Sequence, residues 1–395
     1  MGEQTNPIRL YLLTLQNAFK TISINNIRFV CLSLTRIAKM NLKKHFLLYL
    51  TLLISFPAFS QAPKYSNEFL SIGIGGRAMG MSGAVAASSN DATATTWNPA
   101  GLTRIETDMQ IAVMHTELFA GISKFDYGSL VTKIDTNRSL GFSIVRFATD
   151  DIPNTLELID ASGVIDYSKL KSFSIADYAF ILSYSKISSI PGLRYGGNVK
   201  IIHRKVGEFG KAWGFGFDLG TQYEQNNWQF GLMAKDVTST FNSWSYNTDL
   251  LEETFTKTEN EIPKNTTEIT LPKLIFGIGH KSNITKKITA LIELNMDMTF
   301  DGKRNVMISG DPVSLDPHFG LELGYANFIF LRGGIQNIQE IKEQDGSKST
   351  IVQPNMGLGV KLGRLTIDYA LANIGSQEIP YSNVFSLKLD INKRK

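Results

Sequence analysis

The chain has 395 residues, 43% of them hydrophobic, with 40 basic and 36 acidic residues and a formal charge of +4. Seven of the basic residues and one acidic residue fall within 1–60, so the remainder carries 33 basic and 35 acidic residues and a formal charge of −2. That balance excludes the strongly basic surface of a nucleic-acid-binding protein. Cys31 is the one cysteine and lies within 1–60, so the remainder has no thiol for disulfides or thiolate chemistry.

Residues 40–60 have the architecture of a secretory signal peptide. The segment has a basic start, an apolar run and a small-residue cleavage site: Lys43 and Lys44, residues 46–56, and Ala58-Phe59-Ser60 before Gln61. The apolar run is shorter than the roughly 20 residues of a membrane-spanning helix. Because a signal peptide begins a protein, we expect the start at Met40 and an upstream extension over residues 1–39. A genuine N-terminal tail that buries an apolar helix is the alternative.

Residues 61–107 form a segment of mostly small side chains. Its centre, from Ser71 to Leu102, is SIGIGGRAMGMSGAVAASSNDATATTWNPAGL, which shows neither strand alternation nor a helical stripe. Its glycines permit close backbone approach and positive φ angles. Asn98-Pro99 favours a turn, and residues 88–91 offer a helix N-cap before 92–97. We therefore expect a compact, irregular segment here.

From Asp108 onward, large apolar residues alternate with small or polar ones, as in Trp213-Gly-Phe215-Gly-Phe217-Asp-Leu219-Gly. Strict alternation over this length predicts β-strands, with no amphipathic helix between them. About fourteen segments show it, centred near 109–116, 125–134, 139–148, 173–186, 193–206, 211–224, 228–236, 272–281, 285–298, 318–325, 328–336, 355–362, 364–371 and 384–391.

The connections between these segments alternate in length. Short ones such as 225–227 and 363–364 alternate with long ones, at 149–172, 237–271, 299–317, 337–354 and 372–383. Outer-membrane barrels have short periplasmic turns and long external loops. Their strands pair in a closed ring because lipid offers no hydrogen-bond partners for the backbone groups of an open sheet edge. Residues 108–395 are therefore predicted to form an all-β, transmembrane antiparallel barrel of about 14 strands, located in the bacterial outer membrane. A soluble β-sandwich is the alternative.

A barrel gives the small-residue segment a place to fold, in the lumen or at its mouth. We expect eight of its residues to matter for that structure: Arg77, Met79, Gly80, Asp91, Trp97, Asn98, Pro99 and Ala100. As a hypothesis, Arg77 and Asp91 make polar contacts inside the barrel that fix the segment there.

The stretch GGRAMGMSGAVAASSNDATATTWNPAGL, which begins at Gly75, resembles the N-terminal signature of the PorV/PorQ family. That family belongs to the wider FadL-like outer-membrane proteins, which share an Asn-Pro-Ala element, here Asn98-Pro99-Ala100. The resemblance covers about 35 residues and implies a fourteen-stranded barrel with a role in type IX protein secretion. Compared with FadL, the N-terminal segment of this chain is shorter.

The resemblance implies a non-catalytic accessory protein. Its partners would be type IX translocon or attachment-complex proteins, secreted cargo with C-terminal signal domains, and outer-membrane lipid. The alternative is a FadL-like transporter of hydrophobic small molecules, which needs apolar inward positions next to a break in strand pairing. Because the inward positions are mostly glycine and polar residues, the sequence favours the accessory role.

The predicted loop 237–271 combines acidic residues with an apolar set that is unusual for a solvated loop. We expect these side chains to pack over the barrel mouth or to contact a partner protein: Phe241, Trp244, Tyr246, Leu250, Leu251 and Phe255.

No residue pattern in the chain indicates catalysis. The histidines beyond residue 60 are far apart and lack metal-ligand spacing: His115, His203, His280 and His318. The chain has no nucleophile elbow and no phosphate-binding loop. We therefore expect neither enzymatic activity nor a metal or cofactor.

Overall fold

A computed structural model describes residues 66–159, 163–257, 260–342, 347–374 and 381–392. The predicted upstream extension and signal peptide lie outside these residues. The unit considered below is the one that begins at Pro63 and continues to the end of the chain. None of its described helices has the length and apolar character needed to cross a bilayer.

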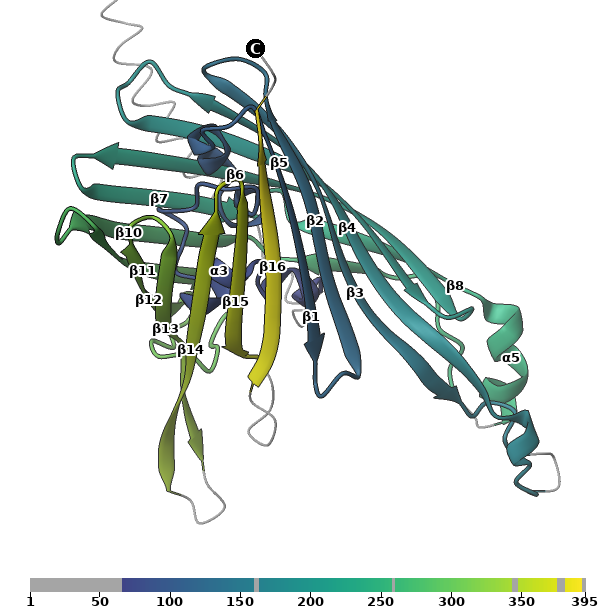
Figure 1. Cartoon of the computed structure of the whole chain (residues 1–395). Helices are drawn as coiled ribbons and strands as arrows, with labels where there is room; N and C mark the ends of the chain where they lie inside the picture. The colour runs from purple at the N-terminus through teal and green to yellow at the C-terminus, as the bar shows by residue number, and fades with distance from the viewer. Residues whose placement is uncertain (1–65, 160–162, 258–259, 343–346, 375–380, 393–395) are drawn as a thin grey trace, which may run out of the picture. The chain divides into compact units, whose positions relative to one another are not determined.

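Fourteen antiparallel strands of the described residues form a closed ring, which confirms the predicted fold class. They are β1 (Met109–Leu118), β2 (Ser123–Lys133), β3 (Arg138–Asn154), β4 (Lys171–Ile187), β5 (Leu193–Val206), β6 (Gly210–Gln225), β7 (Trp228–Lys235), β10 (Lys273–Asn283), β11 (Ile288–Thr299), β12 (Ser314–Tyr325), β13 (Ile329–Lys342), β14 (Lys348–Leu362), β15 (Leu365–Asn373) and β16 (Tyr381–Ile391). Strands β1 and β16 pair and close the ring (Figure 1).

The two faces of each strand have opposite character, as strand β6 shows. Trp213, Phe217 and Leu219 point outward and are exposed, whereas Asp218 and Gln222 point inward and are buried. Around the ring the outward positions carry large apolar side chains, and the inward positions combine polar and charged residues with apolar ones such as Val145 and Ile202. An outward apolar belt is the pattern of a barrel in lipid.

The strand ends confirm the alternation of short and long connections but correct two of the long ones. Strands β3 and β4 extend to Asn154 and from Lys171, and β13 and β14 extend to Lys342 and from Lys348. Much of the predicted loops 149–172 and 337–354 is therefore strand, and the first of these also holds the short helix η3 (Tyr167–Lys169). Beyond the bilayer a hairpin needs no apolar outward face, so its composition resembles that of a loop.

The predicted loop 237–271 is also more regular than expected. It contains strand β8 (Thr240–Tyr246), helix α5 (Thr248–Lys257) and strand β9 (Thr267–Thr270). Strand β8 pairs with β6 and β9 pairs with β8, which extends the wall on the side of the long loops. The prediction of an uninterrupted loop without a helix was wrong, because β8 alternates aromatic residues with Asn and Ser and α5 has only ten residues.

The described part of the small-residue segment, residues 66–105, lies inside the ring and is called the lumenal segment below (Figure 1). Its short helices are η1 (Glu68–Ser71), α3 (Gly76–Gly80), α4 (Ala94–Trp97) and η2 (Pro99–Arg104). Helix α4 begins two residues later than predicted, with Thr93 as its N-cap. The lumenal segment packs its apolar residues, such as Ile74 and Leu102, against inward residues of the wall.

Inward glycines in the wall make room for the backbone of the lumenal segment. A Cβ atom at Gly231 of β7 would lie 2.3 Å from the carbonyl oxygen of Ala86, and one at Gly357 of β14 would lie 3.1 Å from Cα of Gly80. These distances show backbone-level contact between the lumenal segment and the wall. The Gly-rich inward faces noted in the sequence are therefore a docking surface for this segment.

Candidate functional site

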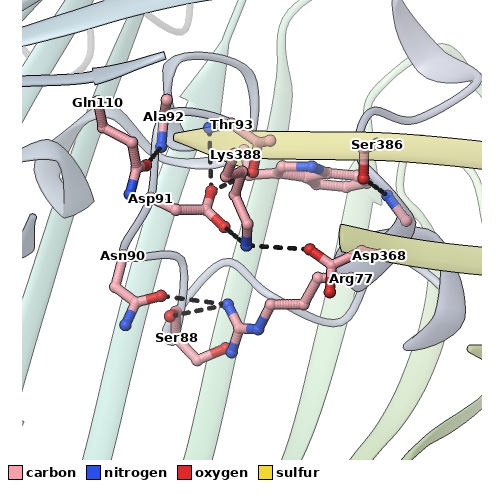
Figure 2. A network of polar contacts seen from close by, with 12 residues as sticks. Arg77, Ser88, Asn90, Asp91, Ala92, Thr93, Gln110, Asp368, Ser386 and Lys388 are labelled. Carbon is pink, nitrogen blue, oxygen red and sulfur yellow. Dashed lines mark hydrogen bonds and ion pairs between the residues drawn. The ribbon is translucent and has the colours of Figure 1, made fainter. Parts of the chain in front are cut away.

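Six charged side chains of alternating sign connect the lumenal segment to four strands. In order of contact this charge chain is Arg77, Glu322, Arg332, Asp368, Lys388 and Asp91. Nε of Arg77 lies 2.9 Å from Oε2 of Glu322 on β12. At the other end, Nζ of Lys388 on β16 lies 2.7 Å from Oδ2 of Asp91 and 3.2 Å from Asp368, as Figure 2 shows.

The middle of the charge chain is withdrawn from water. The side chain of Arg332 is 2% exposed and that of Asp368 is 0% exposed. Burial alone would raise the pKa of Asp91, but Lys388 and Arg77 outweigh it and hold that pKa well below its usual range. A depressed carboxyl pKa stabilises the folded state above the ordinary Asp pKa, and this contribution is lost as the pH falls from that value through the lower pKa of the folded state.

Neighbouring contacts fix the lumenal segment on both sides of Asp91. Thr93 donates to Asp91 through its amide and its hydroxyl. The amide of Ala92 donates to Gln110 on β1 over 2.7 Å, and the amide of Gly76 donates to Ser386 on β16 over 2.8 Å (Figure 2). The positions of Arg77 and Asp91 agree with the hypothesis of polar contacts in the lumen, and their role in fixing the lumenal segment stays a prediction.

The Asn98-Pro99-Ala100 element joins the lumenal segment to strand β6. Nδ2 of Asn98 donates to the carbonyls of Ala86 and Thr221 over 2.9 and 3.0 Å, and its Oδ1 accepts from the Ala100 amide. Asn98 is fully buried. One side chain thus satisfies three backbone groups, which explains why an amide is needed at this position.

The other predicted residues of the lumenal segment serve packing. Nε1 of Trp97 donates to the carbonyl of Ile74 over 2.8 Å, and Met79 is buried beside it in the apolar core. Gly80 approaches the backbone of Gly357 on β14. All eight predicted residues lie in the lumenal segment, between strands that are far apart in the sequence.

The wall is interrupted where strands β7 and β10 give way to β8 and β9. The last β7–β10 pair is Lys235 with Lys273, and the first β8–β9 pair is Thr240 with Thr270. Residues 236–239 on one side and 271–272 on the other lie outside this ladder, and we call these six residues the wall break. Asp236 and Ser239 have left-handed φ angles of 54° and 58°. Pro272, which has no N–H to donate, contributes to the interruption.

A buried lysine holds the wall break against its neighbours. Nζ of Lys200 on β5 lies 2.7 Å from Oδ1 of Asp218 on β6 and 2.5 Å from Oδ1 of Asp236 in the wall break. The Asp236 amide donates to Asp218 over 2.9 Å, and the Thr240 hydroxyl donates to Asp236. The Lys200 side chain is 5% exposed. These residues show no common pattern in the sequence, because only the strand register brings them together.

The beginning of the lumenal segment is attached to the far side of the wall break. Nδ2 of Asn242 on β8 donates to Ser66 and to Asn67, each over 2.7 Å. Asn67 donates to the Thr270 hydroxyl over 2.8 Å, and Ser66 donates to Glu268 over 3.0 Å. The lumenal segment therefore contacts the wall on both sides of the wall break.

A cavity of ≈ 90 Å³ is lined by the lumenal segment, the wall break and adjacent strands. Part of its lining is apolar: Leu70, Ile181, Ile269, Leu271, Pro272 and Phe300. The rest is polar and charged, and includes Lys200, Asp218, Lys235, Asp236, Lys273 and Arg304. The ammonium of Lys235 lies 5.7 Å from the centre of the Trp97 ring. A break in pairing is thus present, but the lining beside it is of mixed character.

The predicted partner-binding residues of 237–271 divide between two environments. Phe241 on β8 is 45% exposed and Leu250 on α5 is 38% exposed, whereas Trp244 and Leu251 are 7% and 5% exposed. Trp244 stacks on Tyr246 and lies 5.2 Å from the Arg204 guanidinium. Phe255 is partly buried. Whether any of these residues contacts a partner stays a prediction.

The structure brings the histidines into no common site. His115 contacts Asp126, His203 stacks on Trp213, His280 contacts Ser282, and His318 contacts the Ser82 carbonyl. Among the described residues, no group of three or more His, Cys, Asp and Glu side chains could hold a metal ion.

Comparison with protein families gives one match. Residues 57–240 match an uncharacterised protein family (UPF0164). The matched region contains the lumenal segment and strands β1 to β7. A search of curated proteins finds no match.

Solved structures with a similar fold are membrane channels and transporters. The CymD monoaromatic hydrocarbon channel aligns with 13% identity and a TM-score of 0.52, covering 82% of this chain and 99% of its own. The P. putida toluene transporter TodX aligns with 14% identity and a TM-score of 0.50, covering 82% and 99%. A Pseudomonas aeruginosa FadL homologue aligns with 11% identity and a TM-score of 0.46, covering 80% and 98%.

At these identities the likeness to CymD and TodX shows the fold alone. This chain shares the barrel fold of these two proteins, in agreement with the antiparallel barrel that the sequence predicts. Together with the outward apolar belt, this fold supports a location in the outer membrane. The closer resemblance to the PorV/PorQ family is not tested by these comparisons.

Proposed function

We propose that this chain is an outer-membrane transporter that passes hydrophobic or amphiphilic small molecules between the lumen and the bilayer through the wall break. The observation that carries the proposal is the interrupted pairing between residues 236–239 and 271–272, beside a cavity lined in part by apolar side chains. On its other side this stretch keeps one backbone hydrogen bond to β6, from the Val237 amide to the Phe217 carbonyl over 2.9 Å. A molecule that left the lumen here would enter lipid without crossing the polar surface of the outer membrane. That CymD is a hydrocarbon channel and TodX a toluene transporter adds support.

Passage would require movement of the lumenal segment. Five residues at the start of the segment line the cavity: Ser66, Asn67, Glu68, Leu70 and Ser71. Ser66 and Asn67 are bonded to Asn242 and Thr270 beyond the wall break. These bonds join uncharged side chains and are each worth about 1 kcal/mol, and the bond from Ser66 to the Glu268 carboxylate is worth about 1.5–3 kcal/mol. By contrast, we expect the buried ion pairs of the charge chain to hold residues 77–91 in place. The beginning of the lumenal segment can therefore move while the remainder stays in place.

A cross-link between positions 67 and 242 tests this proposal. In a background with Cys31→Ser, the pair Asn67→Cys and Asn242→Cys would be oxidised or bridged by a short bifunctional thiol reagent. We expect uptake of radiolabelled toluene and oleate by whole cells to fall at least tenfold after cross-linking and to recover after a disulfide is reduced.

Each single-cysteine variant, treated with the same reagent, is the control for thiol modification alone. Uptake that is unchanged by the cross-link would show that passage does not depend on the wall break. Uptake no faster than in cells without the protein would count against transport of either probe.

A second candidate function is the accessory role in type IX secretion that the PorV/PorQ resemblance implies. The observation that favours it is helix α5, in the extension formed by β8, α5 and β9, which carries exposed Leu250 beyond the strands of the ring. Phe241 pairs with Phe215 and is therefore at the height of the apolar belt. Exposed apolar side chains on a long-loop rim suit contact with a protein partner.

Affinity purification from gently solubilised outer membranes distinguishes the two functions. A tag would be placed between helix α5 and strand β9, and bound proteins would be identified by mass spectrometry. For the accessory role we expect a very large translocon barrel, or secreted proteins that share a C-terminal signal domain. Recovery of this barrel alone, together with positive uptake, would leave the transport function.

A further inference from the structure

Two lysines on the outer wall lie directly opposite each other. Lys205 on β5 and Lys211 on β6 are cross-strand partners, and both side chains are exposed on the lipid-facing side of the ring. Like charges in directly opposed positions of a sheet destabilise it. Among the described residues neither ammonium has a hydrogen-bond or ion-pair partner, and Glu208 in the turn between the strands forms no ion pair with either. We call Lys205 and Lys211 the lysine pair.

The lysine pair lies immediately beyond the aromatic border of the apolar belt. His203 and Trp213 occupy the next outward-facing positions on β5 and β6, toward the middle of the membrane. Their rings are 4.2 Å apart, and Trp213 is 54% exposed. Tryptophan in this setting is typical of the boundary between lipid tails and headgroups. The next outward residues on β6, Phe215, Phe217 and Leu219, belong to the belt.

The length of strand β6 agrees with this depth. Trp213 and Tyr223 point outward ten residues apart, which at about 3.3 Å per residue and a tilt near 40° spans roughly 25 Å. That is about the height of the apolar band of outer-membrane barrels. Trp213 and Tyr223 therefore mark the two borders, and Lys211 lies about 5 Å beyond the first one, among the headgroups.

The same height on neighbouring strands carries further polar and aromatic side chains. Tyr178 on β4 is the cross-strand partner of His203 on β5 and of Arg146 on β3. Arg146 donates to Asp126 over 2.8 Å, so its charge is already paired. The unneutralised charge on this part of the wall is thus that of the lysine pair, which points to an anionic occupant that also contacts the aromatic border.

We propose that the lysine pair binds the phosphate of an anionic membrane lipid, with the acyl chains of that lipid lying along Phe215, Phe217 and Leu219. A phosphate oxygen between the two ammonium groups offsets their repulsion, as an aspartate or glutamate side chain of the protein would in the same place. Since the site is at headgroup depth on the outer wall, lipid is the anion that is always present there. The site is independent of the wall break and of the proposed transport function.

Native mass spectrometry of the detergent-solubilised protein tests the site. The probe is diphosphoryl lipid A, compared with the same lipid after removal of its phosphates. We expect the double variant Lys205→Gln/Lys211→Gln to retain diphosphoryl lipid A with about 30-fold lower apparent affinity, given roughly tenfold or less per lysine near a membrane surface. We also expect the phosphate-free lipid to bind the original chain as weakly as the phosphorylated lipid binds the variant.

A matched control removes two exposed lysines from a short turn at the opposite rim, Lys286→Gln/Lys287→Gln. Heat-modifiable migration on a semi-native gel verifies that each variant is folded. The proposal is overturned if the lysine-pair variant retains the phosphorylated lipid as well as the original chain does. It is also overturned if the control loses as much binding, or if removal of the phosphates makes no difference.

Discussion

Replacement of Arg332 by methionine is expected to lower the free energy of unfolding by about 3 kcal/mol. Arg332 is the central cation of the charge chain, with Nε 2.7 Å from Glu322 and Nη1 2.8 Å from Asp368. Its loss leaves the Glu322 carboxylate paired with Arg77 alone and the Asp368 carboxylate paired with Lys388 alone. The expected effect is at the lower end of the range for a broken buried ion pair, because neither carboxylate becomes fully unpaired. Urea titration in lipid micelles, followed by the folded band on a semi-native gel, measures it.

Arg138→Met is the matched control for this prediction. Arg138 pairs with Asp135 in the short turn between β2 and β3, where both side chains are well exposed. Exposed ion pairs contribute little to stability, so no measurable change is expected. Equal stability of Arg332→Met and the original chain would show that the charge chain does not fix the lumenal segment.

The barrel could be predicted from the sequence because membrane strands have a strong local signal. Outward residues must be apolar over the full height of the belt, so segments such as 211–224 show uninterrupted alternation. All fourteen strands of the ring were identified in this way. The signal ends where the strands leave the lipid, which is why the extensions of β3, β4, β13 and β14 were assigned to loops.

The lumenal segment was recognised for a different reason. Small residues and glycines with neither strand nor helical periodicity indicated a compact irregular segment, and Asn98-Pro99 indicated a turn. The cross-strand partners Glu322, Arg332, Asp368 and Lys388 could not be found, because each looks like an isolated charge on its own strand. The strand register and the position of the lumenal segment inside the ring bring them beside Arg77 and Asp91.

The wall break had even less sequence signal. Asp236 follows an apolar strand and Pro272 precedes one, so both looked like ordinary residues at the ends of a loop. Their significance depends on the fact that β8 and β9 continue the wall on the other side. The mostly polar inward positions, taken as a reason against transport, instead contact the lumenal segment or hold the wall break. For this reason the structure favours the transport alternative more than the sequence did.

Replacement of Lys200 by methionine is expected to destabilise the barrel by about 3–5 kcal/mol and to open the wall break. Lys200 is the cation shared by Asp218 and Asp236, and without it two largely buried carboxylates face each other unpaired. Repulsion between them would push residues 236–239 away from β6. Because Asn242 lies just beyond this stretch, we also expect a lower yield of the cross-link between positions 67 and 242. The urea titration described above measures the stability.

Two further variants separate this cause from general loss of packing. Adding Asp218→Asn and Asp236→Asn to Lys200→Met removes the unpaired charges, so it should recover much of the stability and of the cross-link yield. Lys348→Met, which breaks an exposed pair with Glu340, should change neither quantity. If the triple variant is no more stable than Lys200→Met, charge repulsion is not the cause. A wall break that stayed closed in Lys200→Met would mean that the left-handed backbone at Asp236 and Ser239 holds it without the lysine.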